Sequence, residues 1–245
     1  MAEVTPETEA TVRRPMQAEP PELPDFEGAP AEAILEWAIG EFFPDITVAC
    51  SMQDAVVVDL AWKVDRRVEV FFLETGFHFP ETLATAERIR KRYHLNLVAL
   101  KPVEKPAVYN KDGYQACCGA RKVLPMEAHL VGKKAWVSGA RRADSPSRAH
   151  MKPVEWDERR GLVKVNPIVA WSDEDVDRYI SENDIIVNPL RFQGYESIGC
   201  WPCTLPGSGR EGRWAGTGKL ECGIHQQEPP LERPPRQERG QPRSI

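Results

Sequence analysis

Six cysteines are the residues of this chain with the clearest chemical potential, and four of them form two close pairs. Cys117 and Cys118 are adjacent, whereas Cys200 and Cys203 form a Cys-x-x-Cys motif much later in the chain. Four thiolates from two separate segments suit zinc or an iron–sulfur cluster, and the spacing leaves both open. Neighbouring side chains on a helix diverge by about 100°, so two adjacent sulfurs reach a broad cubane cluster more easily than a single ion.

The alternative for these pairs is that they bind nothing. Cys117 and Cys118 would then be small apolar residues within a helix, and Cys200 and Cys203 a chance or redox pair. That interpretation is as good as metal binding for one pair alone, but the presence of both pairs favours a metal centre. Cys50 ends an apolar run and is interpreted as a buried structural residue.

Cys222 stands apart from these pairs and is the candidate nucleophile. Three cations precede it, Arg210, Arg213 and Lys219, and His225 follows it. Nearby cations lower the pKa of a thiol and so raise its thiolate fraction, which is the attacking species. The alternative is an inert surface cysteine.

Composition limits the classes of protein to consider. The chain has 245 residues, with 32 Lys and Arg against 37 Asp and Glu, which gives a net charge of −5. The first 30 residues carry −5 and the last 20 carry +1, so residues 31–225 carry only −1. Such a near-neutral core is poor support for nucleic-acid binding, and no apolar run approaches the roughly 20 residues of a membrane helix. The first 30 residues lack the features of a secretion signal, so we expect a cytoplasmic protein with neither a nucleic-acid partner nor a membrane partner.

Proline and charge divide the chain into four parts. We expect a disordered, acidic and proline-rich leader at 1–30 and a disordered tail, rich in proline and arginine, at 226–245. Between them, 31–205 is expected to be one α/β domain that binds nucleotide and metal. Residues 206–225 would then be a mobile catalytic segment.

Within the domain, short apolar runs alternate with helical patterns. The sequence predicts strands at 46–50, 68–73, 95–100 and 135–138, helices at 54–64, 80–93 and 118–130, and a further helix start capped by Ser172. Strands that alternate with helices indicate a doubly wound, mostly parallel sheet, which binds ligands at the carboxyl ends of its strands. Beyond Asn188, glycine and proline prevent a prediction of regular structure.

Seven segments together carry a resemblance to a known family. They are 51–59, 73–76 with His78 and 80–82, 117–122, 139–142 with Ser145, 197–204, 210–214 and 221–225. In content and order they resemble the assimilatory adenylyl-sulfate reductases, the iron–sulfur branch of the phosphoadenylyl-sulfate reductase family. The resemblance implies an adenine nucleotide alpha hydrolase-like fold of the PP-loop type.

The resemblance also implies a reaction and its participants. Adenosine 5′-phosphosulfate would be the substrate, attacked by Cys222 to release AMP, and thioredoxin or a glutaredoxin-like dithiol would then release sulfite. This thioredoxin-dependent reduction serves sulfate assimilation and cysteine biosynthesis. A [4Fe–4S] cluster would bind to Cys117, Cys118, Cys200 and Cys203, and the family suggests a homo-oligomer.

The resemblance also assigns site residues, each at a position that matches one of the family's motifs. By resemblance the catalytic residues are Cys222, His225 and Lys122, and the substrate-binding residues are Ser51, Gly76, Lys122, Arg142, Arg210, Arg213 and His225. Thiolate attack on a phosphosulfate requires its negative charge to be neutralised, and cations near Cys222 would do this. Lys122 follows Cys118 by about one helical turn, so it can face both the metal centre and the substrate.

Departures and alternatives remain. Glu74 replaces the aspartate usual in the family, which leaves its contact with the nucleotide open. The cluster-free branch, which reduces 3′-phosphoadenylyl sulfate, lacks the four additional cysteines, although use of both substrates is compatible with this sequence. A PP-loop ATP-pyrophosphatase would have glycines in the loop at 51–54, and a zinc module that binds nucleic acid would need a basic stripe.

Overall fold

A six-stranded sheet is the centre of the structure, a computed structural model that describes residues 20–103, 105–215, 217, 219 and 221–224. The strand order is β3-β2-β1-β4-β6-β5. Only β5 is antiparallel to its neighbour among the strands of this sheet. The strands are β1 (Ile46–Ala49), β2 (Glu69–Leu73), β3 (Leu97–Leu100), β4 (Ala135–Val137), β5 (Val154–Asp157) and β6 (Leu162–Val165). The predicted mostly parallel α/β fold is confirmed.

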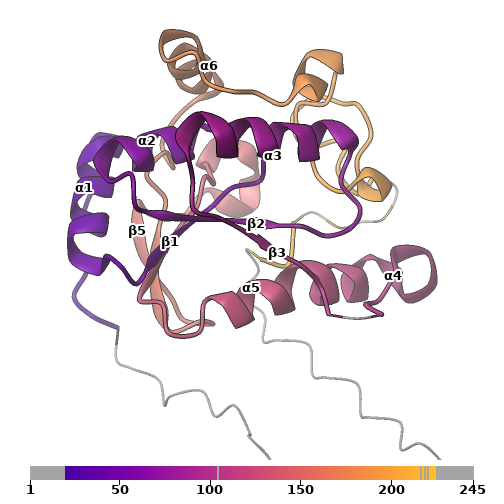
Figure 1. The fold of residues 1–245 in the computed structure, drawn as a ribbon, viewed down its shortest axis with the longest axis horizontal. Helices are drawn as coiled ribbons and strands as arrows, with labels where there is room; N and C mark the ends of the chain where they lie inside the picture. The colour runs from indigo at the N-terminus through magenta and orange to yellow at the C-terminus, as the bar shows by residue number, and fades with distance from the viewer. Residues whose placement is uncertain (1–19, 104, 216, 218, 220, 225–245) are drawn as a thin grey trace, which may run out of the picture.

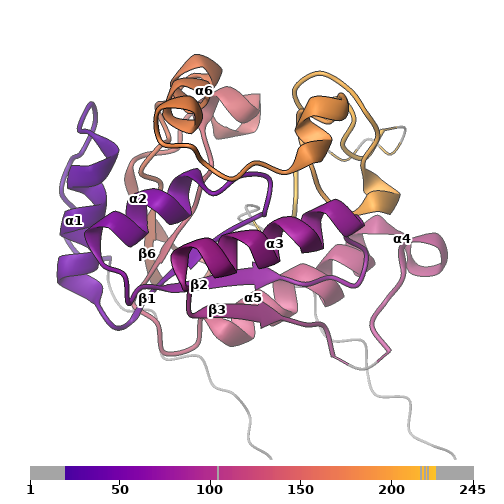
Figure 2. The same cartoon turned by 45° about the horizontal axis from the view of Figure 1, so that its top comes forward.

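Helices cover both faces of this sheet. The α-helices are α1 (Ala31–Phe42), α2 (Val56–Val64), α3 (Pro80–Tyr93), α4 (Tyr109–Cys118), α5 (Leu124–His129) and α6 (Asp173–Glu182). In Figures 1 and 2, α2 and α3 lie on one face of the sheet and α4 and α5 on the other, which is the arrangement of a doubly wound fold.

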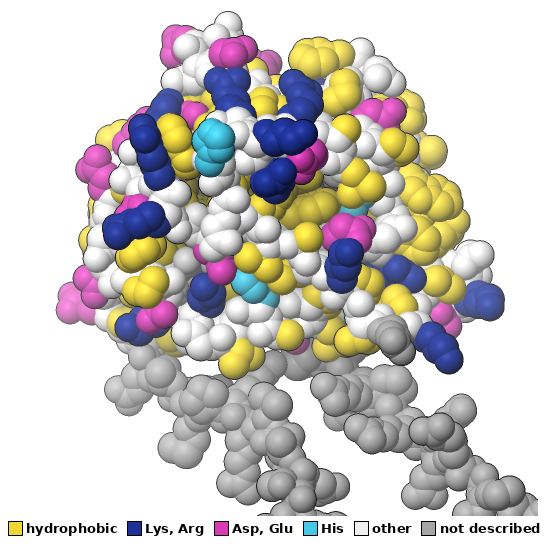
Figure 3. All heavy atoms as spheres, viewed as in Figure 1, with side chains coloured by type: hydrophobic (Ala, Val, Ile, Leu, Met, Phe, Trp, Pro, Cys, Tyr) yellow, Lys and Arg dark blue, Asp and Glu magenta, His cyan; other side chains and the backbone are white. Residues whose placement is uncertain are grey.

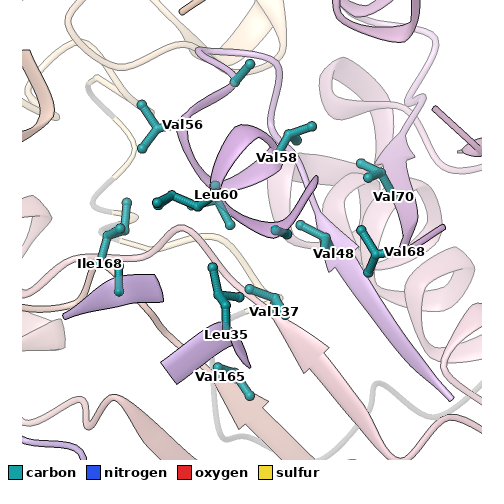
Figure 4. Close-up of a cluster of buried hydrophobic side chains, with 14 of the residues drawn as sticks. Leu35, Val48, Val56, Val58, Leu60, Val68, Val70, Val137, Val165 and Ile168 are labelled. Atoms are coloured by element: carbon teal, nitrogen blue, oxygen red, sulfur yellow. The ribbon is translucent and has the colours of Figure 1, made fainter. Parts of the chain in front are cut away.

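Side chains alternate along the strands between the two faces of the sheet, so each face has an apolar core. Val70 and Phe72 of β2 join the larger apolar cluster with α1, α2 and α3, whereas Phe71 between them joins a smaller cluster with Met126 of α5. Successive strand side chains point to opposite faces, so one apolar run serves both layers. Figure 4 shows the larger cluster, in which strand residues such as Val48 and helix residues such as Leu60 pack together.

Most of the predicted elements are present. All four predicted strands were found, and α3 begins at Pro80 as expected, in the first helical position where a missing N–H costs least. The Ser172 cap is confirmed as a capping box: Asp175 N donates to Ser172 Oγ at 3.1 Å, and Ser172 N donates to Asp175 Oδ2 at 2.9 Å.

The helix predicted at 118–130 is wrong in its bounds and its regularity. Helical structure begins earlier, at Tyr109, and changes to a π-helical turn over Gly119–Val123 before α5 continues it to His129. The Leu124 N–H bonds to the Gly119 carbonyl, five residues back, which widens this turn. Apolar spacing does not reveal such a turn, nor did it reveal α1, β5 and β6.

Strand order defines the switch point of the sheet, where ligands of such folds bind. From β1 the chain progresses outward through β2 to β3 and then returns to place β4 on the other side of β1. The segments that follow β1 and β4, which begin near Cys50 and Ser138, therefore leave the sheet side by side. Parallel sheets bind ligands at this switch point.

Acidic and basic side chains are mixed over the face drawn in Figure 3. This agrees with the small net charge of the whole chain. Among the residues that the structure describes, no helix is both long enough and apolar enough to cross a bilayer.

Asn188 ties the switch-point loop to α3 and provides a test of the fold. Its fully buried Nδ2 donates to Met52 O at 3.2 Å and Thr82 Oγ1 at 3.1 Å, while its Oδ1 accepts from Leu190 N at 3.1 Å. Asn188→Ala leaves these partners unsatisfied, which we expect to cost about 1–3 kcal/mol of unfolding free energy. Urea unfolding measures this loss.

The matched control is Asn96→Ala, at an exposed position. It should change the unfolding free energy by no more than about 0.5 kcal/mol. Equal effects of the two substitutions would show that the buried amide does not hold the loop.

Candidate active site

The structure brings the two cysteine pairs together around one small cavity beyond the carboxyl end of β2. Its lining consists of Phe77, Tyr109, Cys117, Cys118, Arg121, Lys122, Cys200, Pro202, Cys203, Arg213 and Trp214. Thr75, just after β2, lies with its Oγ1 3.3 Å from Cys200 Sγ. The predicted grouping of four thiols with a lysine and an arginine is therefore present in the geometry.

The first pair reaches the cavity because of a local change in helix type. Cys117 and Cys118 end α4, and the wider π-helical turn follows at once. Lys122 lies in that turn and lines the same cavity as both cysteines. Single π-turns within helices are frequent at functional sites, because they change which side chains share a face.

The second pair sits on a short 3₁₀ turn, Trp201–Cys203, that begins at Cys200. Cys203 N donates to Cys200 O at 2.9 Å, and the Thr204 hydroxyl donates to the same carbonyl at 2.9 Å. Trp201 N donates to Phe77 O at 2.9 Å, which joins this turn to the segment after β2. The second pair is thus held in place by backbone hydrogen bonds.

These sulfurs fit a soft metal centre in their chemistry. Four thiols line one cavity, and aromatic rings of Phe77, Tyr109 and Trp201 lie beside it with centroids 5.8–6.0 Å apart. All-thiolate donor sets are those of iron–sulfur clusters and of structural zinc. Within the described part of the chain, no three potential ligands converge as the ligands of a single ion would.

Cys222 lies next to this centre and is buried, with 6% of its surface exposed. Its side chain hydrogen-bonds with that of Cys118, and its backbone N–H donates to Glu221 Oε1 at 2.9 Å. The bond with Cys118, together with the charges of Lys122 and Arg213, holds the pKa of the Cys222 thiol well below its usual value, in spite of burial. Sequence reasoning located this cation-flanked thiol but not its burial.

The pKa of the Cys50 thiol is shifted in the opposite direction from that of Cys222. Burial raises the pKa of its thiol to about 12, and its Sγ lies 3.6 Å from the Asp54 carbonyl oxygen. Its thiolate fraction at neutral pH is therefore negligible. The structure places Cys50 in a partly buried position directly after β1, whereas the sequence predicted a buried residue.

Lys122 is the cation that faces most of these sulfurs. Burial works against its charge, but the nearby groups of Cys200, Cys222 and Cys118 more than offset this effect and raise the pKa of its ammonium above the ordinary value. Lys219 adds a second amine, whose Nζ donates to Cys118 Sγ at 3.1 Å. A positive charge is therefore maintained beside the thiols.

Arg213 is held flat against the second cysteine segment. Its Nη1 donates to Ser197 Oγ at 3.2 Å and to Ile198 O at 3.3 Å, and its guanidinium lies 4.5 Å from the Trp214 ring centroid. A Cβ added at Gly199 would approach its Cζ to 2.5 Å, so a larger residue at this position would displace the guanidinium. The guanidinium Nε is buried and has no hydrogen-bond partner among the described residues.

Two predicted binding residues lie in loops at the strand ends. Ser51 is exposed after β1, where its Oγ accepts from Gln53 N at 3.4 Å. Gly76 adopts a φ of +75°, and its N–H donates to Glu74 Oε1 at 2.8 Å. Glu74, which replaces the usual aspartate, thus closes the turn that requires this glycine.

Two of the remaining predicted residues, Arg142 and Arg210, bind carboxylates of this chain. Arg142 donates to both carboxylate oxygens of Glu27, at 2.7 and 2.6 Å, and from Nε to Met151 O at 2.9 Å. His225 lies outside the described residues. Arg210 donates to Glu221 Oε1 at 2.8 Å, one residue before Cys222.

Arg148 is a site residue that sequence reasoning missed. Only 6% exposed, it donates from Nε and Nη2 to the two oxygens of Glu221, each at 3.0 Å, and from Nη1 to Asp144 at 2.6 Å. The signal was present, because Arg148 lies only three residues beyond Ser145, which belongs to the matched segment.

Gln53 is a second residue near the site that was not predicted from the sequence. Its Nε2 donates to Glu196 O at 3.3 Å, and its Oε1 accepts from Ile198 N at 3.0 Å. One amide thus connects the loop after β1 with the segment that leads into Cys200. A polar residue in a predicted phosphate loop gives no sequence signal for such a contact.

Residues 221–224 are folded against the sheet. The β5–β6 turn supplies two arginines: Arg160 donates to Ile224 O at 3.1 Å, and Arg159 donates to Gly223 O at 3.4 Å. Ile224 packs against the smaller apolar cluster, which includes Trp136. Cys222 is therefore held between this turn and the cysteine cavity.

These features define a nucleotide-binding type of α/β protein with a thiol centre beside its strand ends. Residues 45–206 match the family model described as the phosphoadenosine phosphosulfate reductase domain. The chain belongs to the phosphoadenosine phosphosulfate reductase family.

Relatives and solved structures agree with this membership. A protein of Mycolicibacterium smegmatis named adenosine 5′-phosphosulfate reductase is 44% identical over 92% of this chain and 99% of its own length. One of that name from Streptomyces coelicolor is 43% identical, over 82% of this chain and 90% of its own length.

Among solved structures, phosphoadenylyl-sulfate reductase from Candida auris matches with a TM-score of 0.62 and 25% identity, over 74% of this chain and 92% of its own. FMN adenylyltransferase from Candida glabrata matches with a TM-score of 0.57 and 17% identity, over 73% of this chain and 65% of its own. This second likeness is one of fold.

Gly212 closes the loop that carries Arg210 and Arg213, and its substitution tests that closure. Leu205 N donates to Gly212 O at 2.9 Å, and a Cβ at Gly212 would overlap the Leu205 carbonyl oxygen. Gly212→Ala should open the loop and speed tryptic cleavage after its arginines by about tenfold or more. Timed proteolysis followed by mass spectrometry measures this rate.

Ser208→Ala, at an exposed position in the same loop, is the control and should leave the cleavage rate unchanged. Cleavage of the Gly212 variant at the wild-type rate would contradict the role of this contact.

Proposed function

We propose that this protein reduces adenosine 5′-phosphosulfate to sulfite and AMP, with Cys222 as the nucleophile and thioredoxin or a glutaredoxin-like dithiol as the reductant. The observation that carries the proposal is a fifth thiol, Cys222, buried beside the four-cysteine cavity that Lys122 and Arg213 also line. Relatives named adenosine 5′-phosphosulfate reductase support the choice of substrate.

In the first half-reaction the Cys222 thiolate attacks the sulfur of the sulfuryl group. A sulfur–sulfur bond forms, the bond between that sulfur and the bridging oxygen breaks, and AMP leaves with the electron pair. Negative charge grows on the departing phosphate, and fixed cations stabilise it most effectively in a water-poor site. Lys122 and Arg213 are suited to this role, and the planar guanidinium matches sulfate or phosphate oxygens.

The second half-reaction releases sulfite from S-sulfonated Cys222. A thiolate of the dithiol partner attacks the cysteine sulfur, sulfite leaves with the bonding electrons, and the partner closes its own disulfide. The partner thereby supplies the two electrons. Cys222 must be exposed for this step, so we assign residues 206–225 as the segment that opens, with 31–205 as the nucleotide and cluster domain between a leader at 1–30 and a tail at 226–245.

We assign Cys117, Cys118, Cys200 and Cys203 as the ligands of a [4Fe–4S] cluster. Their shared cavity and the aromatic rings beside it support this assignment. When bound, the cluster supplies structural order and an electrostatic field beside Cys222, with no expected change of oxidation state. The nucleotide would bind at Ser51 and Gly76, and His225 would complete the anion site with Arg142, Arg210 and Arg213.

Use of 3′-phosphoadenylyl sulfate, alone or as a second substrate, is the alternative. The likeness to the Candida auris enzyme named for that substrate supports it. An ATP-pyrophosphatase is less well supported, because the loop at 51–54 has no glycine to approach a pyrophosphate. We further propose a cytoplasmic homo-oligomer.

Substitution of individual cysteines after anaerobic purification tests the proposal. Cys222→Ser should retain the iron but lose sulfite formation from adenylyl sulfate and thioredoxin by at least about a thousandfold, because a hydroxyl is a far weaker nucleophile at neutral pH. Cys203→Ser, in contrast, should lose the iron in addition to sulfite formation. Iron analysis and a sulfite assay measure the two properties.

Cys50→Ala is the matched control, since this partly buried thiol has a raised pKa and is not one of the proposed ligands or the nucleophile. It should keep both iron and turnover. Turnover by the Cys222 variant at the wild-type rate would refute the nucleophile. Faster turnover of 3′-phosphoadenylyl sulfate than of adenylyl sulfate would favour the alternative substrate.

A further inference from the structure

Glu221 occupies an unusual position for a carboxylate, directly before the nucleophile and buried among arginines. Only 8% exposed, it accepts four hydrogen bonds: two from Arg148 at 3.0 Å, one from Arg210 at 2.8 Å and one from Cys222 N at 2.9 Å. Burial opposes its charge, but the two guanidiniums hold the pKa of this carboxyl below its ordinary value.

Arg210, which contacts Glu221, and Arg213 of the same loop have more hydrogen-bonding capacity than the described residues satisfy. The Nε atoms of Arg210 and Arg213 are buried and have no hydrogen-bond partner within the described residues. Buried donors without partners are costly, so such sites are typically completed by a ligand or ordered water. An acceptor-rich anion is the ligand chemistry that fits these donors.

Glu221 also connects these arginines to the position of Cys222. The Cys222 N–H bonds to the same carboxylate that Arg148 and Arg210 hold, so the ion pairs act directly on the backbone of the nucleophile. Without that negative charge, two guanidiniums would face each other with only Asp144 to neutralise Arg148. Buried like charges that lose their counter-ion are strongly destabilising.

We propose that Glu221 is an internal counter-anion: in the ligand-free protein it takes the place at Arg148 and Arg210 that a sulfuryl or phosphoryl group takes in the complex, and it thereby holds Cys222 in the closed position. Glu221 and Arg148 are positioning residues in this account, because they act through the backbone of Cys222. The inference rests on the proposed function only in naming the sulfuryl or phosphoryl group as the anion. Its test requires no turnover, so the counter-anion role and the proposed reaction can each fail without the other.

Hydrogen–deuterium exchange on the anaerobically purified full-length protein tests this role. In Glu221→Gln the amide keeps the shape but not the charge, so peptides that cover 221–224 should exchange about tenfold faster than in the wild type. Inorganic sulfate should slow this exchange again in the variant, because it restores the missing anion. In the wild type, where Glu221 already fills the place, sulfate should have little effect.

Glu211→Gln provides the control, since it removes an exposed carboxylate from the same segment. It should exchange like the wild type with and without sulfate. Faster exchange of Glu221→Gln that sulfate does not reverse would mean that Glu221 is a structural residue and would overturn the proposal. Exchange at the wild-type rate would overturn it equally.

A second measurement is the affinity for AMP. Loss of the internal competitor should make Glu221→Gln bind AMP several-fold more tightly than the wild type, by isothermal titration. Unchanged or weaker binding would contradict competition for the arginines. If Glu221→Gln does not fold, as judged by circular dichroism and iron content, Glu221→Asp serves in the exchange test. Its shorter reach should also give faster exchange that sulfate slows, and its failure to respond to sulfate would overturn the proposal.

Discussion

The position of Cys222 depends on one buried ion pair, in which Arg148 holds both oxygens of Glu221 while the same carboxylate accepts from the Cys222 backbone. Arg148 in turn is fixed by Asp144, in the 3₁₀ turn Arg142–Asp144 that follows β4. The sheet therefore determines where the nucleophile lies, although Cys222 comes long after the last strand. Removal of one partner from such a pair costs far more than an exposed ion pair would contribute.

Besides this pair, the fold assembles the cysteine cavity from segments that follow β2 and β3. The turn after β2 supplies Thr75 beside Cys200, and the π-helical turn brings Lys122 to the same cavity. Figures 1 and 2 show the late segment that carries Cys200 near α4 and the start of α3, at the end toward which the β2 arrow points. Distant parts of the sequence meet there because parallel strands all end at one edge.

The sequence predicted the scaffold well because burial on both faces leaves a clear pattern in short strands. It also predicted that the cysteine pairs, Lys122 and Arg213 would meet, since matched motifs carry that information. The β5–β6 hairpin was missed because its strands are short and polar residues such as Glu155 and Lys164 interrupt them, joined to each other by an ion pair at 2.7 Å.

Other parts of the site depend on tertiary contacts that composition conceals. The expected leader contains Glu27, which pairs with Arg142, and Phe26, which packs near the Trp37 ring with centroids 5.4 Å apart. A proline-rich, acidic composition predicts disorder without revealing such contacts. Burial of Cys222 likewise follows from Arg148 and Arg160, which lie far from it in the sequence.

The central claim is that one thiol takes the sulfuryl group while four others hold the metal centre. Mass analysis of peptides from enzyme quenched after mixing with adenylyl sulfate, in the absence of any dithiol, tests this claim most directly. The account predicts one added sulfonate on the peptide that contains Cys222. A sulfonate on any other cysteine, or none while AMP is released, would contradict it.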